Sequence, residues 1–172
     1  MKYLFFILLI PQFLWSDPTS TYILKSIPHN GLYSFADPRN AQMSFFLTPY
    51  GIVTLEDLYY HPQTTQVCKK EIIVFYIDHS DKRYFVQEHM YIEQKYHIEF
   101  KKDTRAVIYV QGTTTLSEIL LKEGLAYVVP NFYDKEFLYR FKQAQKDARL
   151  HQKGIWKDKV LVQCMAQYNV PR

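Results

Sequence analysis

Only two cysteines, Cys68 and Cys164, occur in the chain, and they allow two kinds of chemistry. In an oxidising compartment an even number of cysteines indicates a disulfide, here one that joins the middle of the chain to its C-terminal segment. Closing so long a loop would stabilise the fold by roughly 4 kcal/mol, because it restricts the unfolded chain. The alternative is a Cys68 nucleophile paired with His61, which needs a lowered thiolate pKa that nothing nearby obviously provides. The disulfide is the leading prediction.

Other polar clusters allow metal or phosphate binding. Residues 78–81, Asp-His-Ser-Asp, could hold a metal, but a solvated turn explains them as well. A basic stripe is predicted on a helix, and it would contact phosphates only if it faced the binding site: Lys142, Lys146, Arg149 and Lys153. The sequence contains no phosphate-binding Gly-rich loop, zinc motif, Cys-x-x-Cys pair or Gly-x-Ser-x-Gly elbow.

The start of the sequence has the pattern of an export signal. Lys2 precedes an apolar run over residues 3–15, and Ser16 offers a cleavage site before Asp17. The run is too short to span a membrane comfortably, so we expect a periplasmic or secreted protein with no stable membrane span after cleavage. An uncleaved anchor is the alternative.

Composition favours one compact domain. The 172 residues are 17% aromatic and include only 5 glycines, which argues against a disordered or linker-rich chain. The formal charge of +4 permits binding to a polyanion without requiring it.

The first half of the chain predicts a β-meander. Strands are expected over 19–27, 32–36 and 41–47, with turns at 28–31 and 37–40. Residues 48–51, Thr-Pro-Tyr-Gly, are expected to interrupt the third strand. Such a meander suits a small Greek-key barrel.

The middle of the chain is less clear. Residues 64–76 have helical spacing, although 72–77 is also a continuous apolar run that could form a buried strand. Alternation predicts a strand over 91–100, in which Gln94 breaks the apolar side, and 101–104 form a turn.

The last third is the most strongly patterned. A strand at 105–110 precedes a capping box formed by Thr115 and Glu118, which predicts a helix over 116–123 that Gly124 ends. After a strand at 125–129, Asp134 caps a long helix that is expected to run to Gly154. The predicted buried side carries Phe137, Phe141, Ala144 and Ala148, and Trp156 is expected to anchor the chain end.

This order of elements resembles the C-terminal half of the staphylococcal nuclease (thermonuclease) family. The matching segments are Leu116-Ser-Glu118, Lys122-Glu-Gly-Leu-Ala126, Ala148 and Gly154-Ile-Trp156; the resemblance is clear over 105–156 and thin before it. It implies an α+β fold, a five-stranded OB-type barrel with about three helices. The expected organisation is a signal segment at 1–16, the domain at 17–160 and a C-terminal tail at 161–172.

The resemblance also implies site residues. Family members hold calcium on two aspartates, activate or orient water with a glutamate, and neutralise phosphate with two arginines. Glu56 matches the glutamate and Arg105 matches the second arginine. Two aromatic residues after the Gly-Leu-Ala strand, Phe132 and Tyr133, could stack on bases or pack in the core. Lys101 and Lys102, beside Arg105, could contact substrate or only charge a strand edge.

The metal ligands of the family are replaced. Val53 and Leu32 stand where the two aspartates belong, and Thr48 stands where the first arginine belongs. Calcium affinity depends strongly on ligand charge, so calcium is expected only if the site has been rebuilt. Asp37, Arg39 and Asp57 are the neighbouring residues that could rebuild it.

Three hypotheses follow. The preferred one is an exported thermonuclease-like domain that has lost the calcium site and binds nucleic acid, DNA or RNA, or a protein partner. The second is a metal-dependent phosphodiesterase built around Glu56 and Arg105. The third is a structural periplasmic domain stabilised by its disulfide.

Overall fold

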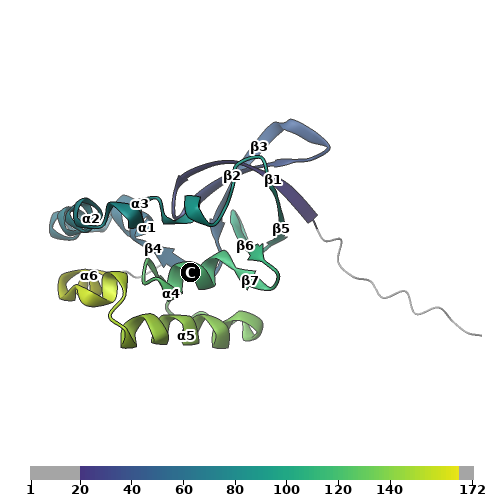
Figure 1. Ribbon diagram of the computed structural model, residues 1–172. Helices are drawn as coiled ribbons and strands as arrows, with labels where there is room; N and C mark the ends of the chain where they lie inside the picture. Colours follow the sequence, from purple (N-terminus) through teal and green to yellow (C-terminus); the bar gives the residue numbers. More distant parts are fainter. Residues whose placement is uncertain (1–19, 167–172) are drawn as a thin grey trace, which may run out of the picture.

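The computed structural model describes residues 20–166. A β-barrel and a layer of helices make up the domain, with α4 between the barrel and α5 (Figure 1). The predicted signal segment at 1–16 lies outside the described residues. Among residues 20–166, no helix is long and apolar enough to cross a membrane.

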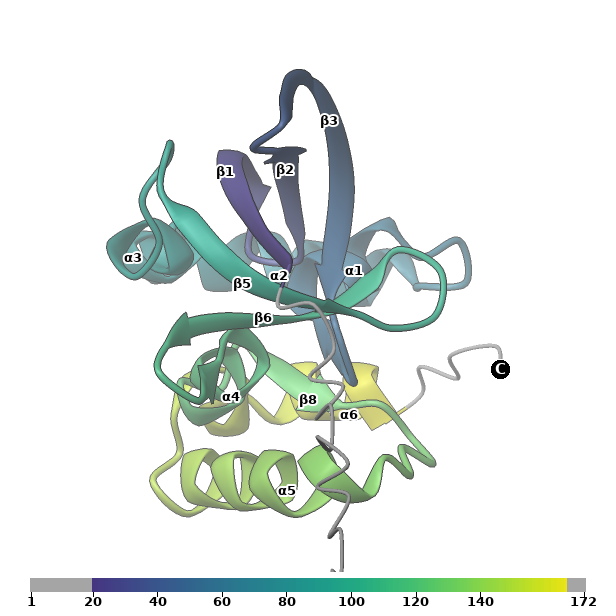
Figure 2. The same cartoon turned by 90° about the vertical axis from the view of Figure 1, so that its right-hand side faces the viewer.

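Five strands close the barrel, with four antiparallel pairings and one parallel pairing. The meander consists of β1 (Ser20–His29), β2 (Leu32–Asp37) and β3 (Asn40–Pro49). β5 (Lys95–Phe100) pairs with β1, and β6 (Arg105–Gln111) pairs with β5. Parallel pairing of β3 with β6, Thr48 opposite Arg105, completes the ring. The predicted OB-type barrel is confirmed, and Figure 2 shows β5 and β6 crossing below β1, β2 and β3.

The sequence predicted that residues 48–51 interrupt the third strand, but Thr48 and Pro49 belong to β3. β3 continues to Pro49 because its end pairs with β6, and the turn comes at Tyr50 and Gly51. Inward side chains of alternate residues fill the barrel, and Leu24, Tyr33 and Phe35 are fully buried. This burial, at about 1.5–3 kcal/mol for each large apolar side chain, positions the strand ends that form the candidate site.

Short elements then lead to α2. β4 (Ile52–Thr54) runs directly into α1 (Leu55–Tyr60), which Thr54 and Asp57 cap reciprocally. α2 (Gln66–Asp78) begins at the Thr65 cap, and α3 (Ser80–Arg83) and a 3₁₀ turn, Phe85–Glu88, follow. The ambiguous segment is thus helical: Ile72 and Phe75 are buried whereas the residues between them are exposed, which only a helical period produces.

The strand expected over 91–100 is four residues shorter. Residues 91–94 form a turn in which Glu93 has a positive φ of 66°, and β5 begins at Lys95. Ile92 is 56% exposed, whereas Tyr96 and Ile98 are buried as predicted. Gln94, the polar residue that breaks the apolar side of the predicted strand, directly precedes the start of β5.

The C-terminal elements follow the predicted order. β7 (Thr114–Thr115) leads into α4 (Leu116–Lys122), whose capping box joins Thr115 and Glu118. β8 (Ala126–Val128) pairs with β4, and α5 (Lys135–Leu150) begins at its Asp134 cap. Arg140 of α5 donates to both carboxylate oxygens of Glu118, at 2.8 and 2.6 Å, so one charged pair ties α5 to the start of α4.

Gly154 does not end the long helix, because α5 already stops at Leu150. Gly154 instead begins a 3₁₀ turn, Gly154–Lys157, at a φ of 51°. A Cβ on Gly154 would lie 2.3 Å from the carbonyl oxygen of Gly124, and Ile155 donates to that oxygen at 2.9 Å. The backbones after α4 and after α5 therefore approach closely at Gly124 and Gly154, and neither position has room for a Cβ.

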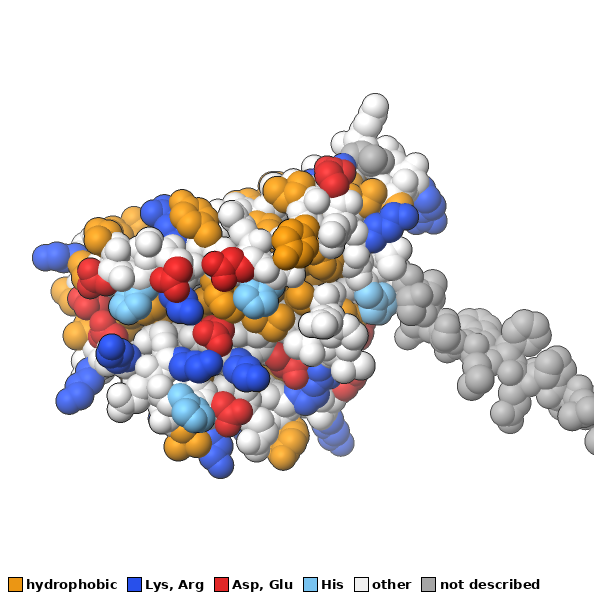
Figure 3. Space-filling model, in the orientation of Figure 1, with side chains coloured by type: hydrophobic (Ala, Val, Ile, Leu, Met, Phe, Trp, Pro, Cys, Tyr) orange, Lys and Arg blue, Asp and Glu red, His pale blue; other side chains and the backbone are white. Residues whose placement is uncertain are grey.

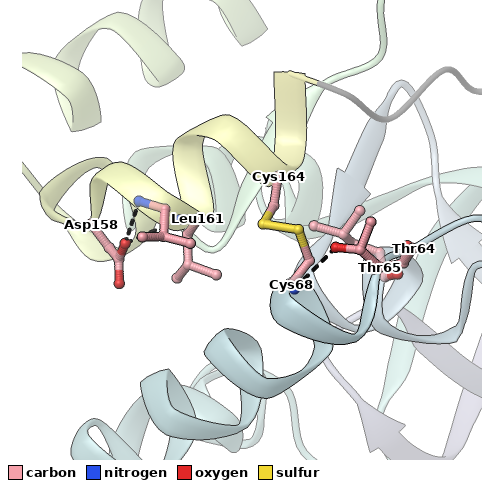
Figure 4. Close-up of a disulfide and its surroundings, with 8 residues drawn as sticks. Thr64, Thr65, Cys68, Asp158, Leu161 and Cys164 are labelled. Atoms are coloured by element: carbon pink, nitrogen blue, oxygen red, sulfur yellow. Dashed lines mark hydrogen bonds between the residues drawn. A yellow bond between two sulfur atoms is a disulfide. The ribbon is translucent and has the colours of Figure 1, made fainter.

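The disulfide between Cys68 and Cys164 is present. It joins α2 to α6 (Lys159–Ala166), and the Cα atoms are 5.7 Å apart (Figure 4). Asp158 caps α6 by accepting from Leu161 N–H at 3.0 Å. Residues 161–166, expected to belong to a tail, thus form part of α6 and bury Leu161, Cys164 and Met165 against the domain. A nucleophilic Cys68 is excluded, since its sulfur is bonded to Cys164.

Candidate functional site

A cavity of about 440 Å³ opens where β3, β4 and β6 meet α1. We call it the barrel-mouth cavity. Its polar lining combines a guanidinium, a carboxylate and two imidazoles with hydroxyl groups: His29, Thr48, Asp57, His61, Thr104 and Arg105. The arrangement arises because β3 and β6 run parallel here, so that their ends lie beside each other.

Arg105 is the cation of this cavity. It is the first residue of β6 and is partly buried, and its guanidinium makes no hydrogen bond or ion pair with any residue between 20 and 166. An unpaired guanidinium in a partly desolvated cavity offers a planar set of donors that suits phosphate or carboxylate oxygens.

Asp57 supplies the negative charge, but much of its capacity is already used. Its Oδ2 accepts from the Thr54 amide at 2.8 Å and from the Thr54 hydroxyl at 3.0 Å, as part of the α1 capping box. Burial raises the pKa of Asp57, while these hydrogen bonds and the charges of His29 and Arg105 oppose the rise. The carboxylate thus has a structural role at the start of α1.

His29 lies at the end of β1 and lines the same cavity. Its Nδ1 accepts a hydrogen bond from the Gly31 amide at 3.1 Å, which places the proton of the neutral ring on Nε2. Burial lowers the pKa of His29, and the Asp57 charge opposes this. A role for His29 could not be predicted from the sequence, because the residue lies within an expected turn and no motif marks it.

Glu56 does not face the barrel-mouth cavity. It points to the other side of α1, into a second cavity of about 310 Å³ between β1, α1, α2 and α3, which Arg105 does not line. Its Oε1 accepts from Tyr76 Oη at 2.8 Å and from Asn30 Nδ2 at 3.1 Å. Burial raises the pKa of this carboxyl, in part against the Tyr76 hydrogen bond. The structure therefore separates the two residues that the family resemblance paired.

The residues at the barrel mouth do not fit a calcium ion. Leu32 and Val53, which the resemblance places at the two aspartate positions, line the cavity with hydrocarbon, and the Asp57 carboxylate already accepts two hydrogen bonds from Thr54. Asp37 and Arg39 pair with each other in the β2–β3 turn, at 2.8 and 3.1 Å, and line neither this cavity nor the second one. Among residues 20–166, no three His, Cys, Asp or Glu side chains gather as a metal site, the 78–81 segment included.

The predicted lysine contacts lie away from both cavities. Lys101 is held by Glu99 and by Asp134 at 3.8 Å, and its ammonium lies over the rings of Tyr50 and Phe137. Lys102 is exposed in the turn before β6. A substrate role for either residue remains a prediction.

The two aromatic residues before α5 have different environments. Phe132 packs inward, with its ring stacked on Phe141 at 5.6 Å and edge-on to Tyr50 at 5.2 Å. Tyr133 is 87% exposed, so its ring face is accessible for stacking.

The predicted basic stripe, which runs along α5 and continues to Lys153 beyond the helix, does not line the barrel-mouth cavity. Arg149 lies over the Trp156 ring at 5.0 Å, and Lys153 pairs with Glu123 at 2.9 Å. On the face drawn in Figure 3, basic and acidic side chains are interspersed rather than gathered into one basic surface. The stripe is therefore a solvated face that helps to pack the chain end.

Comparison with known families places this fold. The family model described as staphylococcal nuclease homologue matches residues 61–158, which is more than half of the chain. The match includes Arg105 and both close-packed glycines, and it begins after Val53 and Glu56. No curated protein matches the chain.

Proposed function

Because the chain belongs to the staphylococcal nuclease family, we propose that it is an exported thermonuclease-like domain that binds single-stranded DNA or RNA through phosphate groups at the barrel-mouth cavity. We propose further that binding occurs without the calcium-dependent cleavage of the family. Arg105, unpaired in that cavity, is the observation that carries the proposal.

The chemistry of the cavity supports a phosphate ligand. The guanidinium of Arg105 supplies charge and paired donors, and the Nε2–H of His29 supplies a neutral donor. The hydroxyl groups of Thr48 and Thr104 can add hydrogen bonds without a charge. Phosphate contacts of this kind give affinity without reading base sequence, so we expect little sequence preference.

The lining of the cavity supports the proposed lack of cleavage. Val53 and Leu32 have no side-chain oxygen to bind a metal ion, and Glu56 lines a different cavity from Arg105. The disulfide supports export, because such bonds persist mainly in oxidising compartments.

The test combines binding and cleavage on the same protein, purified with its disulfide intact. Fluorescently labelled single-stranded DNA and RNA would be titrated at several salt concentrations, with calcium, magnesium or chelator. We expect salt-dependent binding that the chelator does not change, and no cleavage. Arg105→Ala should weaken binding at least about tenfold, as expected for a charged hydrogen bond.

Arg39→Ala is the matched control, since it removes the same charge from an exposed turn outside the cavity. If both variants weaken binding equally, general charge rather than the cavity binds the nucleic acid. If instead the protein cleaves with calcium or magnesium, and both Glu56→Gln and Arg105→Ala abolish cleavage, the second hypothesis of a working phosphodiesterase replaces this proposal. A protein partner becomes the better hypothesis if no nucleic acid binds.

A further inference from the structure

The second cavity, which we call the tyrosine cavity, is a separate candidate binding site. It has a volume of about 310 Å³, and its walls are formed by tyrosine and isoleucine side chains around one carboxylate: Tyr59, Tyr60, Tyr76, Tyr84, Ile72 and Ile73, with Glu56. A volume near 300 Å³ is at the lower end for small-molecule sites, and this lining exposes about as much polar as apolar surface. It shares only His29 and Tyr60 with the barrel-mouth cavity.

Glu56 is the carboxylate of this cavity, whose other polar groups are His29, Arg83 and the tyrosine hydroxyl groups. Its residue is 7% exposed, and Oε1 is fully used by Tyr76 and Asn30. Oε2 is buried and has no hydrogen-bond donor within residues 20–166. A buried carboxylate oxygen without a donor costs free energy, and a positively charged donor on a ligand would remove that cost.

The surrounding rings suit the same charge. Tyrosine faces attract ammonium groups, more strongly where water is excluded. Tyr59 and Tyr60 already stand edge to face at 5.1 Å, and Tyr76 is fixed by its hydrogen bond to Glu56. Isoleucine side chains from α2 complete an apolar wall that would contact the hydrocarbon part of a ligand.

Arg83 adds a positive group to the lining. It is exposed, lies 5.8 Å over the Tyr84 ring, and makes no ion pair with a carboxylate in the described part of the chain. A purely cationic ligand would be repelled by it. A ligand that carries both an ammonium and a carboxylate would satisfy Glu56 inside the cavity and Arg83 at its edge.

We propose that the tyrosine cavity binds a small zwitterion with an apolar body, such as an aromatic amino acid, with its ammonium on Glu56 and its carboxylate on Arg83. The site does not depend on the phosphate-binding function. Glu56, retained from the family pattern, would thereby serve ligand binding rather than hydrolysis.

The test uses isothermal titration calorimetry of the full protein with three matched probes. L-phenylalanine carries both charges, phenethylamine lacks the carboxylate, and 3-phenylpropionate lacks the ammonium. We expect saturable binding of L-phenylalanine, and binding at least about tenfold weaker for each of the other two. No saturable binding of L-phenylalanine, or equal binding of all three probes, would overturn the proposal.

Variants then locate the site. Glu56→Gln keeps an oxygen for Tyr76 but removes the charge, and Arg83→Gln removes the opposite charge; each should weaken L-phenylalanine binding at least about tenfold. Tighter binding to Arg83→Gln would refute the assigned role of Arg83. Should Glu56→Gln fail to fold, Ile73→Trp, at a position 46% exposed, fills the cavity from its rim and should abolish binding. Arg105→Ala should leave binding unchanged, which separates this result from the phosphate test.

Discussion

Removing the disulfide is the perturbation whose size the structure defines best. Cys68 and Cys164 are 96 residues apart in sequence, so their bond closes most of the described domain into one loop. A cross-link of this length lowers the entropy of the unfolded chain by an amount worth about 4.7 kcal/mol at 25 °C. We expect the Cys68→Ala, Cys164→Ala double variant to lose roughly 4–5 kcal/mol of unfolding free energy. Its Tm should fall by roughly 10–20 °C.

Urea denaturation followed by circular dichroism measures this loss. Both cysteines are buried, at 6% and 5% exposure, so alanine also removes some packing. The wild-type chain in reducing agent is the control, because it lacks the bond but keeps both side chains. A loss below about 1 kcal/mol in the reduced wild-type protein would refute the loop-closure argument. A loss confined to the double variant would assign the effect to packing.

Three further predictions concern stability. Gly124→Ala should lower the free energy of unfolding by at least about 1–3 kcal/mol, because φ is +68° there and the new Cβ would lie 2.2 Å from the Lys153 carbonyl oxygen. Thermal or urea unfolding measures this loss, and an unchanged Tm would show that the contact can relax freely. Thr115→Ala should cost about 1 kcal/mol through loss of the α4 cap, measured against Thr113→Ala in the preceding turn, and equal losses would contradict the capping role. Burial raises the folded-state pKa of Glu56 above 4.5, so folding favours the neutral carboxyl. The contribution of this group to the free energy of unfolding is therefore complete below pH 4.5 and is lost as the pH rises through the folded-state pKa. Glu56→Gln should therefore gain stability relative to wild type between pH 4.5 and pH 7.5 in urea titrations, and a constant difference would contradict it.

Elements whose ends are fixed by neighbouring residues could be predicted from the sequence, whereas elements whose ends depend on distant contacts could not. The α4 helix and its cap followed from Thr115 and Glu118 alone, because a capping box involves only neighbours. The end of α5 did not follow, since Gly154 meets Gly124 across 30 residues, and a positive φ marks a close contact as readily as a helix end.

The candidate site shows the same division. The expectation that calcium is not bound comes from Val53 and Leu32, whose side chains carry no oxygen, and it stays a prediction. The placement of Glu56 and Arg105 in different cavities could not be predicted, because Tyr76 and Asn30, which hold Glu56, are distant from it in sequence. Tyr76, which fixes Glu56, lies 20 residues away along the chain.

The link between α2 and α6 has a consequence for proteolysis. The turn before β6 is exposed at Lys102, Asp103 and Thr104, and it lies inside the loop that the cysteines close. A protease that cuts once at this turn would separate β5 from β6 in sequence, yet the two fragments would remain a single covalent molecule. While the disulfide is oxidised, a nicked domain would therefore keep its two fragments tethered to each other.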